Sequence, residues 1–512
     1  MHKLKVLTPP NPPLGLPLRK MNTANRTPLK LETLNNEMFK ALREKTVNLK
    51  KEKVYVHFPK DNLNIMSIEK TCPLTFLMLK HKYKIDTTSV QIGVVKNYVH
   101  GTSQGVCAGS GIESDGNNQE VDKNDGNGTI NNSCGSVNFL DSFVQFNIPV
   151  LSEYERVYFF KHIIEIIDTL AADVVYRHSI GGYKKNDKYN FVTVLFNNLK
   201  VCEKSSIHHE FCFSLSEQIP LTINCYIVHS GNTSYILKLD FFQEDKLVFD
   251  IFTTFVNINS LTFKPQEVVH VNNSMNVKKY DEVNKFACHL KDVQNLFNHK
   301  DVKCKCLHQD DIYFVLNFFK NAHVQVQNKP YHNKNAYVNT NIYDEEQNEK
   351  NTLSLIENVL GKSNLSFYVG KNSYYCNDSY IESNHFISSE FKNIHNFTFG
   401  GYLAYLSFCH AMTVIKHFIP RPVLIEINEI QYILPVPYNS VVSFRGKIVY
   451  SDEQKIHIKV AAYTFDFKKK EHYLTTIFDL SFENNSEISF IPQSGEEVKL
   501  YLFSYIRSHL VP

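Results

Sequence analysis

The sequence lacks three features that would each point to a special class of protein. It has no strong excess of charge, because 55 Lys and Arg against 52 Asp and Glu leave a formal net charge of +3 over 512 residues. It has no uninterrupted apolar run of about eighteen residues, which a membrane-spanning helix needs. Its 11 cysteines show no regular framework, and no secretory hydrophobic segment precedes them. We therefore expect no nucleic-acid partner, no transmembrane segment and a reducing, intracellular setting.

Glycine is scarce outside one segment. Residues 101–136 hold eight of the 19 glycines, together with many Asn and Asp residues and very few apolar ones. Such a composition cannot offset the entropy lost on ordering, so the sequence predicts a disordered insertion here.

The first 52 residues form a separate basic segment. The first thirty contain no acidic residue but six basic ones, namely Lys3, Lys5, Arg19, Lys20, Arg26 and Lys30. This asymmetry suits an organelle-targeting segment, whereas the prolines suit a plain disordered tail, and both interpretations stay open. A polar surface helix is expected at 31–52 and a short strand at 53–59.

Apolar periodicity predicts the same order of elements twice. With 43% hydrophobic and 13% aromatic residues, the chain can form more than one core. The first copy has a strand at 141–149, a helix at 161–178 and strands at 189–199, 221–229, 234–243 and 246–257. The second has a strand at 379–386, a helix at 400–418 and strands at 423–432, 440–450, 455–467 and 472–482. An internal repeat of this kind is strong evidence for architecture.

A long segment rich in Asn and Lys, 258–377, connects the two copies, and 486–512 extends beyond the second. Helices are expected in the connecting segment at 311–320 and 352–360. It also holds Cys304, Cys306 and His308, but a zinc site would require a second paired cluster, which the sequence does not show. We therefore expect no metal site.

The helix of the second copy is apolar on nearly every side and starts at Gly400 and Gly401. A helix of this kind is buried. Glycine in its first turn allows close approach of another group, and the unpaired N–H groups there suit an oxygen with partial negative charge.

The stretch from Asn393 to Gly401, NIHNFTFGG, resembles the N-I-F-N-x-I-F-G-G entry to the helix in the mitochondrial branch of the double-hotdog acyl-coenzyme A thioesterases. Weaker likenesses to the same family are Glu165, Asp168-Thr169-Leu170, Tyr176-Arg177-His178, Arg421-Pro422-Val423, Glu426 to Ile430 and Pro435-Val436. The resemblance implies an α+β protein with two hotdog domains in tandem, each an antiparallel sheet around one helix. Their expected bounds are 53–257 and 378–485.

The resemblance also implies catalytic residues. Asn393 would orient the water or the carbonyl, and the amides of Gly400 and Gly401 would stabilise an oxyanion. The family's acid lies about two turns after the glycines, where this chain has Phe408 and Cys409. The first copy instead carries Asp168 on the shoulder of its apolar face, where partial burial would raise its pKa and suit a general base.

The two copies therefore complement each other. We expect one composite site built from Asp168, Asn393 and the two glycines, and a second, inactive position where Phe160 and Lys161 meet Phe408 and Cys409. Simpler interpretations remain: Asp168 as a helix-surface acid, Asn393 as a turn-forming residue, Glu165 as either a substitute base or a solvated residue, and His178 and His410 as structural histidines. Arg421, Arg445 and Lys447 are candidates for binding coenzyme A phosphates, or are simply exposed.

The implied activity is hydrolysis of fatty acyl-coenzyme A to free fatty acid and coenzyme A, without metal or redox cofactor. The alternative is a non-catalytic double hotdog that binds acyl-coenzyme A or serves in assembly. A hotdog hydratase is disfavoured, because no Asp-x-Asn-Pro-x-His cluster starts a helix. By resemblance, we also expect a homo-oligomer, specifically a trimer of double hotdogs, located in mitochondria or alternatively in the cytoplasm.

Overall fold

A computed structural model describes residues 55–56, 62–84, 86–95, 136–149, 159–183, 189–201, 219–259, 262–274, 277, 279–298, 303–304, 373–393, 397–466, 469–486 and 488–510. Several expectations lie outside these residues. They are the N-terminal tail and its helix, nearly all of the strand at 53–59, the insertion up to residue 135, the helices at 311–320 and 352–360, and Cys306 and His308.

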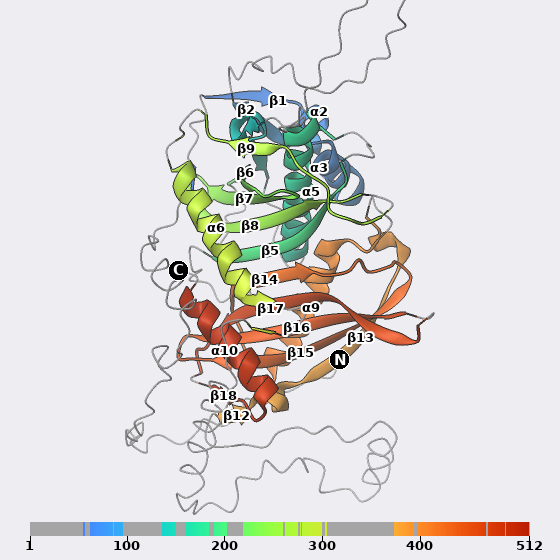
Figure 1. Ribbon diagram of the computed structural model, residues 1–512, viewed down its shortest axis with the longest axis vertical. Coiled ribbons are helices and arrows are strands. Elements are labelled where there is room, and N and C mark those ends of the chain that lie inside the picture. Colours follow the sequence, from blue (N-terminus) through green and yellow to red (C-terminus); the bar gives the residue numbers. More distant parts are fainter. Residues whose placement is uncertain are drawn as a thin grey trace, which may run out of the picture.

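The described chain is built on one antiparallel sheet of twelve strands (Figure 1). Its spatial order is β1 (Leu63–Met66), β2 (Gln91–Val95), β4 (Val144–Ile148), β6 (Leu221–Ser230), β7 (Ser234–Gln243), β8 (Lys246–Asn257), β5 (Phe191–Val201), β14 (Leu424–Tyr432), β17 (Glu471–Glu483), β16 (Lys455–Asp466), β15 (Ser440–Ser451) and β13 (Ile381–Ile387). The α+β class with a large antiparallel sheet, which the sequence predicted, is confirmed.

The two halves of the sheet repeat one connectivity. In each half a strand is followed by a long helix and then by four strands: β4, α5 (Phe159–Ile180), β5, β6, β7 and β8, then β13, α9 (Gly400–Lys416), β14, β15, β16 and β17. The halves join where β5 pairs with β14, with Asn197 opposite Glu429 and Phe196 opposite Ile430. The sheet therefore runs without a break from one half into the other.

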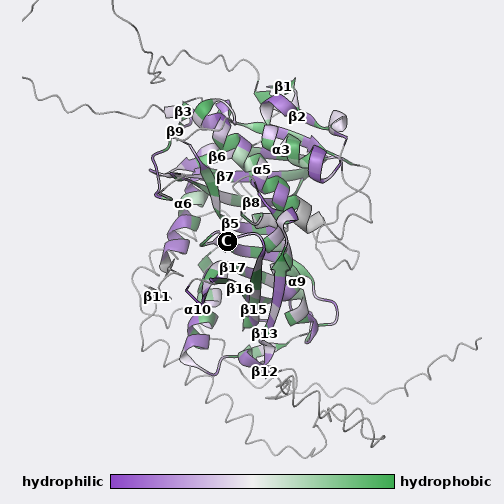
Figure 2. Cartoon of the chain, turned by 90° about the vertical axis from the view of Figure 1, so that its right-hand side faces the viewer, coloured by the Kyte–Doolittle hydropathy of each residue, from purple (hydrophilic) through white to green (hydrophobic). Residues whose placement is uncertain are grey.

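Helices cover both faces of the sheet. Figure 2 shows α5 and α9 along one face, and α6 (Tyr280–Leu296) and α10 (Gly495–Leu510) along the other. Because side chains alternate along a strand, neighbouring strand residues contribute to different layers. Ile227 belongs to the layer under α5 and α9, whereas Val228 packs with residues of α6.

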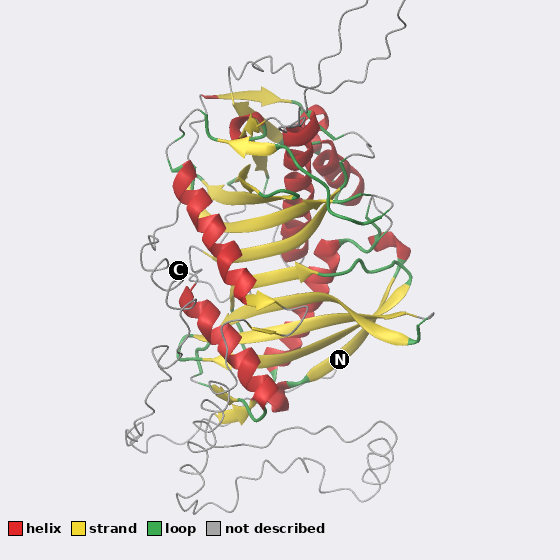
Figure 3. Cartoon of the chain, in the orientation of Figure 1, coloured by secondary structure: helices red, strands yellow, loops and turns green. Residues whose placement is uncertain are grey.

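The sequence did not predict α6 or α10, which are clear in Figure 3. α6 buries a stripe against the sheet, which consists of Tyr280, Val283, Ala287 and Leu290. In contrast, α10 is buried over most of its length, including all residues from Tyr501 to Arg507. The sequence also missed a group of short helices beside α5, comprising α2 (Ile68–Thr71), α3 (Pro73–Leu77) and the π-helical turn η3 (Met78–Lys82).

Asp173 on α5 fixes this group of short helices. Its carboxylate accepts hydrogen bonds from the backbone N–H of Leu74 at 3.1 Å and from that of Thr75 at 2.9 Å. The Thr75 hydroxyl donates a third bond at 2.8 Å. These bonds satisfy amides in the first turn of α3, which have no partner inside the helix. They hold η3, which follows directly, beside α5.

Candidate active site

Helix α5 presents two carboxylates toward the second half of the protein. Glu165 and Asp168 are three residues apart and therefore lie on one side of the helix. Glu165 is fully buried and Asp168 is partly exposed. Figure 2 shows α5 and α9 along the same face of the sheet, and Glu165 packs against Gly401 in the first turn of α9.

Gly401 is the point where the two helices touch. A Cβ atom added to Gly401 would lie 2.4 Å from Cγ of Glu165 and 3.2 Å from the backbone nitrogen of Glu165. No side chain fits at such a distance, so glycine is required for this packing. The Gly-Gly start that the sequence singled out thus brings the second-half helix against the acid-bearing side of the first-half helix.

Replacing Gly401 with Ala should separate α5 from α9 locally. Overpacking of a dense core typically costs about 1–3 kcal/mol, and it outweighs the gain in helix propensity of about 1 kcal/mol. We expect a lower free energy of unfolding by urea denaturation and a loss of any activity that depends on the contact. The control is Thr413→Ala on the exposed side of α9. Equal behaviour of the two variants would contradict the contact.

Asp168 is linked to the first residue of α9 through Tyr432. Its carboxylate accepts a hydrogen bond from the Thr193 hydroxyl on β5. Its charge also helps to raise the pKa of Tyr432, after burial, which is the larger cause. The Tyr432 hydroxyl, on β14, donates to the carbonyl oxygen of Gly400 at 2.9 Å. Asp168, Tyr432 and Gly400 therefore form one group that spans both halves.

Burial raises the pKa of both carboxyl groups. The pKa of Asp168 rises to about 6, opposed by the hydrogen bond from Thr193, which agrees with the sequence prediction of a raised value. The pKa of Glu165 rises to about 7, opposed by the charge and hydrogen bond of Lys82. A carboxylate with a pKa near neutrality is a stronger base than an exposed one and still exists in its ionised form.

Lys82 reaches this group from η3. Its Nζ lies 2.6 Å from Oε1 of Glu165 and 4.7 Å from the centre of the Phe399 ring. Phe399 directly precedes Gly400, so Lys82 links η3, α5 and the entry to α9. The sequence carried no signal for Lys82, for Thr193 or for Tyr432, because they come from three distant segments and only the fold brings them together.

The first turn of α9 supplies the polar groups that an oxyanion needs. The amides of Gly400 and Gly401 are in its first turn, where helical N–H groups have no acceptor within the helix. The positive end of the helix dipole lies at the same place. An oxygen that gains negative charge near Asp168 would be stabilised there.

Asn393 forms a turn. Its side-chain oxygen accepts a hydrogen bond from the backbone N–H of Phe397 at 3.1 Å, and its own backbone N–H donates to the carbonyl of Phe397 at 2.7 Å. This is the structural role that the sequence left open beside the catalytic one. Residues 394–396, which follow Asn393, lie outside the described chain. Its catalytic role stays a prediction.

The three basic candidates lie apart from this group. Arg421 is exposed beyond the C-terminal end of α9, and a helix of 17 residues is about 25 Å long. Arg445 on β15 pairs with Glu382 at 3.1 Å. Lys447, also on β15, pairs at 3.0 Å with Glu497 of α10, which covers the opposite face of the sheet. The structure does not bring them to the start of α9.

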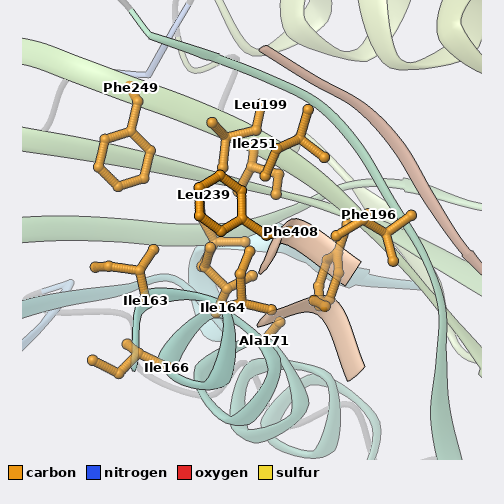
Figure 4. Close-up of a cluster of buried hydrophobic side chains, with 14 of the residues drawn as sticks. Ile163, Ile164, Ile166, Ala171, Phe196, Leu199, Leu239, Phe249, Ile251 and Phe408 are labelled. Carbon is orange, nitrogen blue, oxygen red and sulfur yellow. The ribbon is translucent and has the colours of Figure 1, made fainter. Parts of the chain in front are cut away.

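Phe408, one of the residues expected at the inactive position, is packed among apolar side chains. Figure 4 shows Phe408 of α9 among Ile163 and Ile164 of α5 and Leu199 of β5. Phe408 is 4% exposed, and burial raises the pKa of the adjacent Cys409 thiol. The side chains of Phe160 and Lys161 lie outside the described residues. The inactive second position therefore stays a prediction.

The two histidines have structural partners. His410 bonds to the hydroxyl of Ser383 at 2.8 Å and to the backbone carbonyl of Ile381 at 3.1 Å. His178 lies 3.4 Å from the hydroxyl of Ser142, and burial lowers its pKa to about 4.

Within the described residues, no group of three or more His, Cys, Asp or Glu is placed to hold a metal ion. No described helix is both long and apolar enough to cross a membrane.

The curated proteins to which the chain is similar are named as mitochondrial acyl-coenzyme A thioesterases. No family model matches the chain. The mouse protein named acyl-coenzyme A thioesterase 10, mitochondrial, is 21% identical over 350 residues, which cover 67% of this chain and 70% of that protein. The human protein named acyl-coenzyme A thioesterase 9, mitochondrial, is 20% identical over 379 residues, or 71% and 76% of the two chains.

The chain resembles the mitochondrial acyl-coenzyme A thioesterases. The resemblance that the sequence motifs indicated is thus confirmed. Among solved structures, an acyl-CoA hydrolase from Staphylococcus aureus matches with 18% identity, a TM-score of 0.25 and coverage of 27% of this chain and 88% of that one. An acyl-CoA hydrolase from Bacillus cereus matches with 16% identity, a TM-score of 0.25 and coverage of 27% and 88%.

Proposed function

We propose that this protein is a thioesterase that hydrolyses fatty acyl-coenzyme A to free fatty acid and coenzyme A. Its two halves, 53–257 and 378–485, act as a tandem pair of hotdog domains with one composite site between α5 and α9. The observation that carries the proposal is the contact of the acid-bearing side of α5 with the glycine start of α9, at Glu165 and Gly401.

The chemistry follows from the groups at that contact. Asp168 accepts a proton from a water molecule, whose oxygen attacks the thioester carbon. The amides of Gly400 and Gly401 stabilise the resulting oxyanion, which then collapses, breaks the C–S bond and releases coenzyme A. These steps need water and the groups named here, so the proposal includes no metal or redox cofactor.

The direct test is the release of coenzyme A by purified protein, followed with a thiol reagent over acyl chains of several lengths. Release above the uncatalysed rate is the expected result. Binding of acyl-coenzyme A without release would instead favour the second candidate, a non-catalytic binding or assembly module. That candidate is supported by Asn393, whose side-chain oxygen is already used by Phe397.

The rate should depend on pH through Asp168. Its pKa is raised to about 6, and the base must be ionised, so kcat/KM should rise as the pH increases through about 6. The Thr193 hydrogen bond lowers that pKa; Thr193→Val should therefore raise it and move the rising limb to higher pH. Initial rates between about pH 4.5 and 8 locate the rising limb in the wild type and in Thr193→Val. A limb that stays in place in Thr193→Val would exclude Asp168 as its origin.

Three further features belong to the same proposal. The relatives are named as mitochondrial proteins, and the basic, acid-free first thirty residues fit that location. A homo-oligomer, a trimer of these double units, is proposed by resemblance. Contacts of Arg421, Arg445 or Lys447 with the phosphates of coenzyme A stay proposals as well, and for Arg445 and Lys447 they would require opening the ion pairs with Glu382 and Glu497.

A further inference from the structure

Glu165 is a buried acid for which the proposed hydrolysis has no use so far. Its side chain is fully buried, yet only Oε1 has a partner among the described residues, namely Lys82. Oε2 is also buried and has no hydrogen-bond partner there. A buried, unsatisfied carboxyl oxygen is costly, so it normally has a functional reason or an unseen partner.

The position of Glu165 indicates what that partner could be. The side chain lies directly against Gly401 in the first turn of α9 and one helical turn from Asp168. The same first turn is where the proposed reaction places the thioester. Lys82 holds Oε1, which leaves Oε2 as the carboxyl oxygen that has no hydrogen-bond partner among the described residues.

We propose that Glu165 is a second catalytic residue of this site, a general acid that protonates the departing sulfur of coenzyme A, and that Lys82 positions it. The inference rests on the proposed thioesterase function. It divides the work between two carboxyl groups: Asp168 takes a proton from water, and Glu165 donates one to the leaving group.

The step balances without any other reactant. The water oxygen forms a bond to the thioester carbon while its proton passes to Asp168. When the tetrahedral intermediate collapses, the C–S bond breaks, its electron pair stays on sulfur, and the proton of Glu165 joins it to form the thiol. Transfer of the proton from Asp168 to Glu165, through water, restores the starting state.

The electrostatics allow these two protonation states to coexist. Among the described residues, the charged groups that act on Glu165 are Lys82 from η3 and Asp168 on its own helix, and the uncharged Gly401 of α9 packs against it. Asp168 ionises above about 6 and Glu165 keeps its proton up to about 7. The working state should therefore be most populated between these values, with kcat/KM for acyl-coenzyme A falling again at higher pH.

The decisive experiment varies the leaving group. The same acyl group is offered to wild type and to Glu165→Gln either on coenzyme A, an alkyl thiol, or on 4-nitrothiophenol, a far more acidic thiol that leaves without protonation. We expect Glu165→Gln to lower kcat/KM about 100-fold for the acyl-coenzyme A and less than about 5-fold for the aryl thioester. Equal losses on both substrates, or no loss on either, would overturn the assignment.

Two controls separate this inference from other causes. Asp173→Asn removes another buried carboxyl group of α5, one bound to α3, and should affect both substrates equally. Asp168→Asn should impair both substrates strongly. If wild type hydrolyses neither thioester, the proposed function itself fails; if Asp168→Asn loses activity but Glu165→Gln does not, only the role of Glu165 fails.

Lys82→Met tests the same residue without altering it. Lys82 lowers the pKa of Glu165, so its removal should raise that pKa and shift the falling limb of the pH profile to higher pH. Lys82→Arg keeps the charge and should restore the limb. A falling limb that does not move in Lys82→Met would contradict the proposal, even if Glu165→Gln were too unstable to assay.

Discussion

Replacing Asp168 with Asn is expected to lower kcat for acyl-coenzyme A hydrolysis by roughly a hundredfold to ten-thousandfold, the usual range for loss of a positioned general base. Asn has nearly the same shape and can still meet the Thr193 hydroxyl, but it cannot accept a proton from water. The KM should change little, because the side chain acts on the reacting water. Steady-state kinetics on acyl-coenzyme A measure both constants.

The matched control for this variant is Asp173→Asn on the same helix. Burial raises the pKa of Asp173 to about 7, so it resembles Asp168 electrostatically, but its carboxylate is bound to Leu74 and Thr75. We expect it to reduce stability and to leave kcat largely unchanged. Undiminished turnover in Asp168→Asn would remove this residue from the mechanism, and the composite site would then need another base.

Replacing Arg507 with Met should destabilise the junction of the two halves by about 3–5 kcal/mol, the typical cost of removing one partner of a buried ion pair. Arg507 comes from α10 and is 7% exposed. One guanidinium nitrogen lies 2.6 Å from Glu429 on β14, and another lies 2.6 Å from the side-chain oxygen of Asn197 on β5. Because β5 and β14 are the paired strands of the junction, one side chain joins both halves.

Urea denaturation compares this variant with Arg445→Met, which makes the same substitution in an exposed ion pair. Arg445 and Glu382 are each more than one-third exposed, so their pair should contribute less than about 1 kcal/mol. A further variant, Arg507→Met with Glu429→Leu, should recover part of the loss, because it removes the buried charge along with its partner. Equal stabilities of Arg507→Met and Arg445→Met would show that the junction does not depend on this residue.

The local sequence pattern was sufficient to predict the main helices and strands. The helix expected at 161–178 is α5, and each of the eight strands expected after the two long helices has its counterpart among β5 to β8 and β14 to β17. Each of these helices and strands buries one face or all of its faces. The spacing of its apolar residues therefore indicates whether it is a helix or a strand. The same pattern did not reveal α6, because its apolar stripe is narrow and surrounded by polar residues. It did not reveal α10 either, because the buried residues of that helix include the polar Glu497, Ser504 and Arg507.

The residues of the candidate site also divide into those that the sequence predicted and those that it did not. Gly400 and Gly401 were visible in the sequence as a glycine pair at the start of an apolar helix. Asp168 was visible as a carboxylate at the edge of an apolar helix face. Lys82 and Tyr432 were not, because each is an ordinary residue of its own segment and gains its meaning from a partner far along the chain. For Asn393 the sequence allowed either a catalytic or a turn-forming role, and only the backbone geometry showed the turn.

The amino-acid sequence alone determined the repeated order of strand, helix and four strands, the buried character of both long helices and the likeness to the acyl-coenzyme A thioesterases. Only the tertiary structure decided that Glu165 touches Gly401, that Lys82 holds Glu165 and that Arg507 joins β5 to β14. The physical reason is that these contacts join residues that are far apart along the chain. Periodicity reports which side of an element is buried, whereas the partner across a contact depends on how separate elements pack, which no single stretch of sequence encodes.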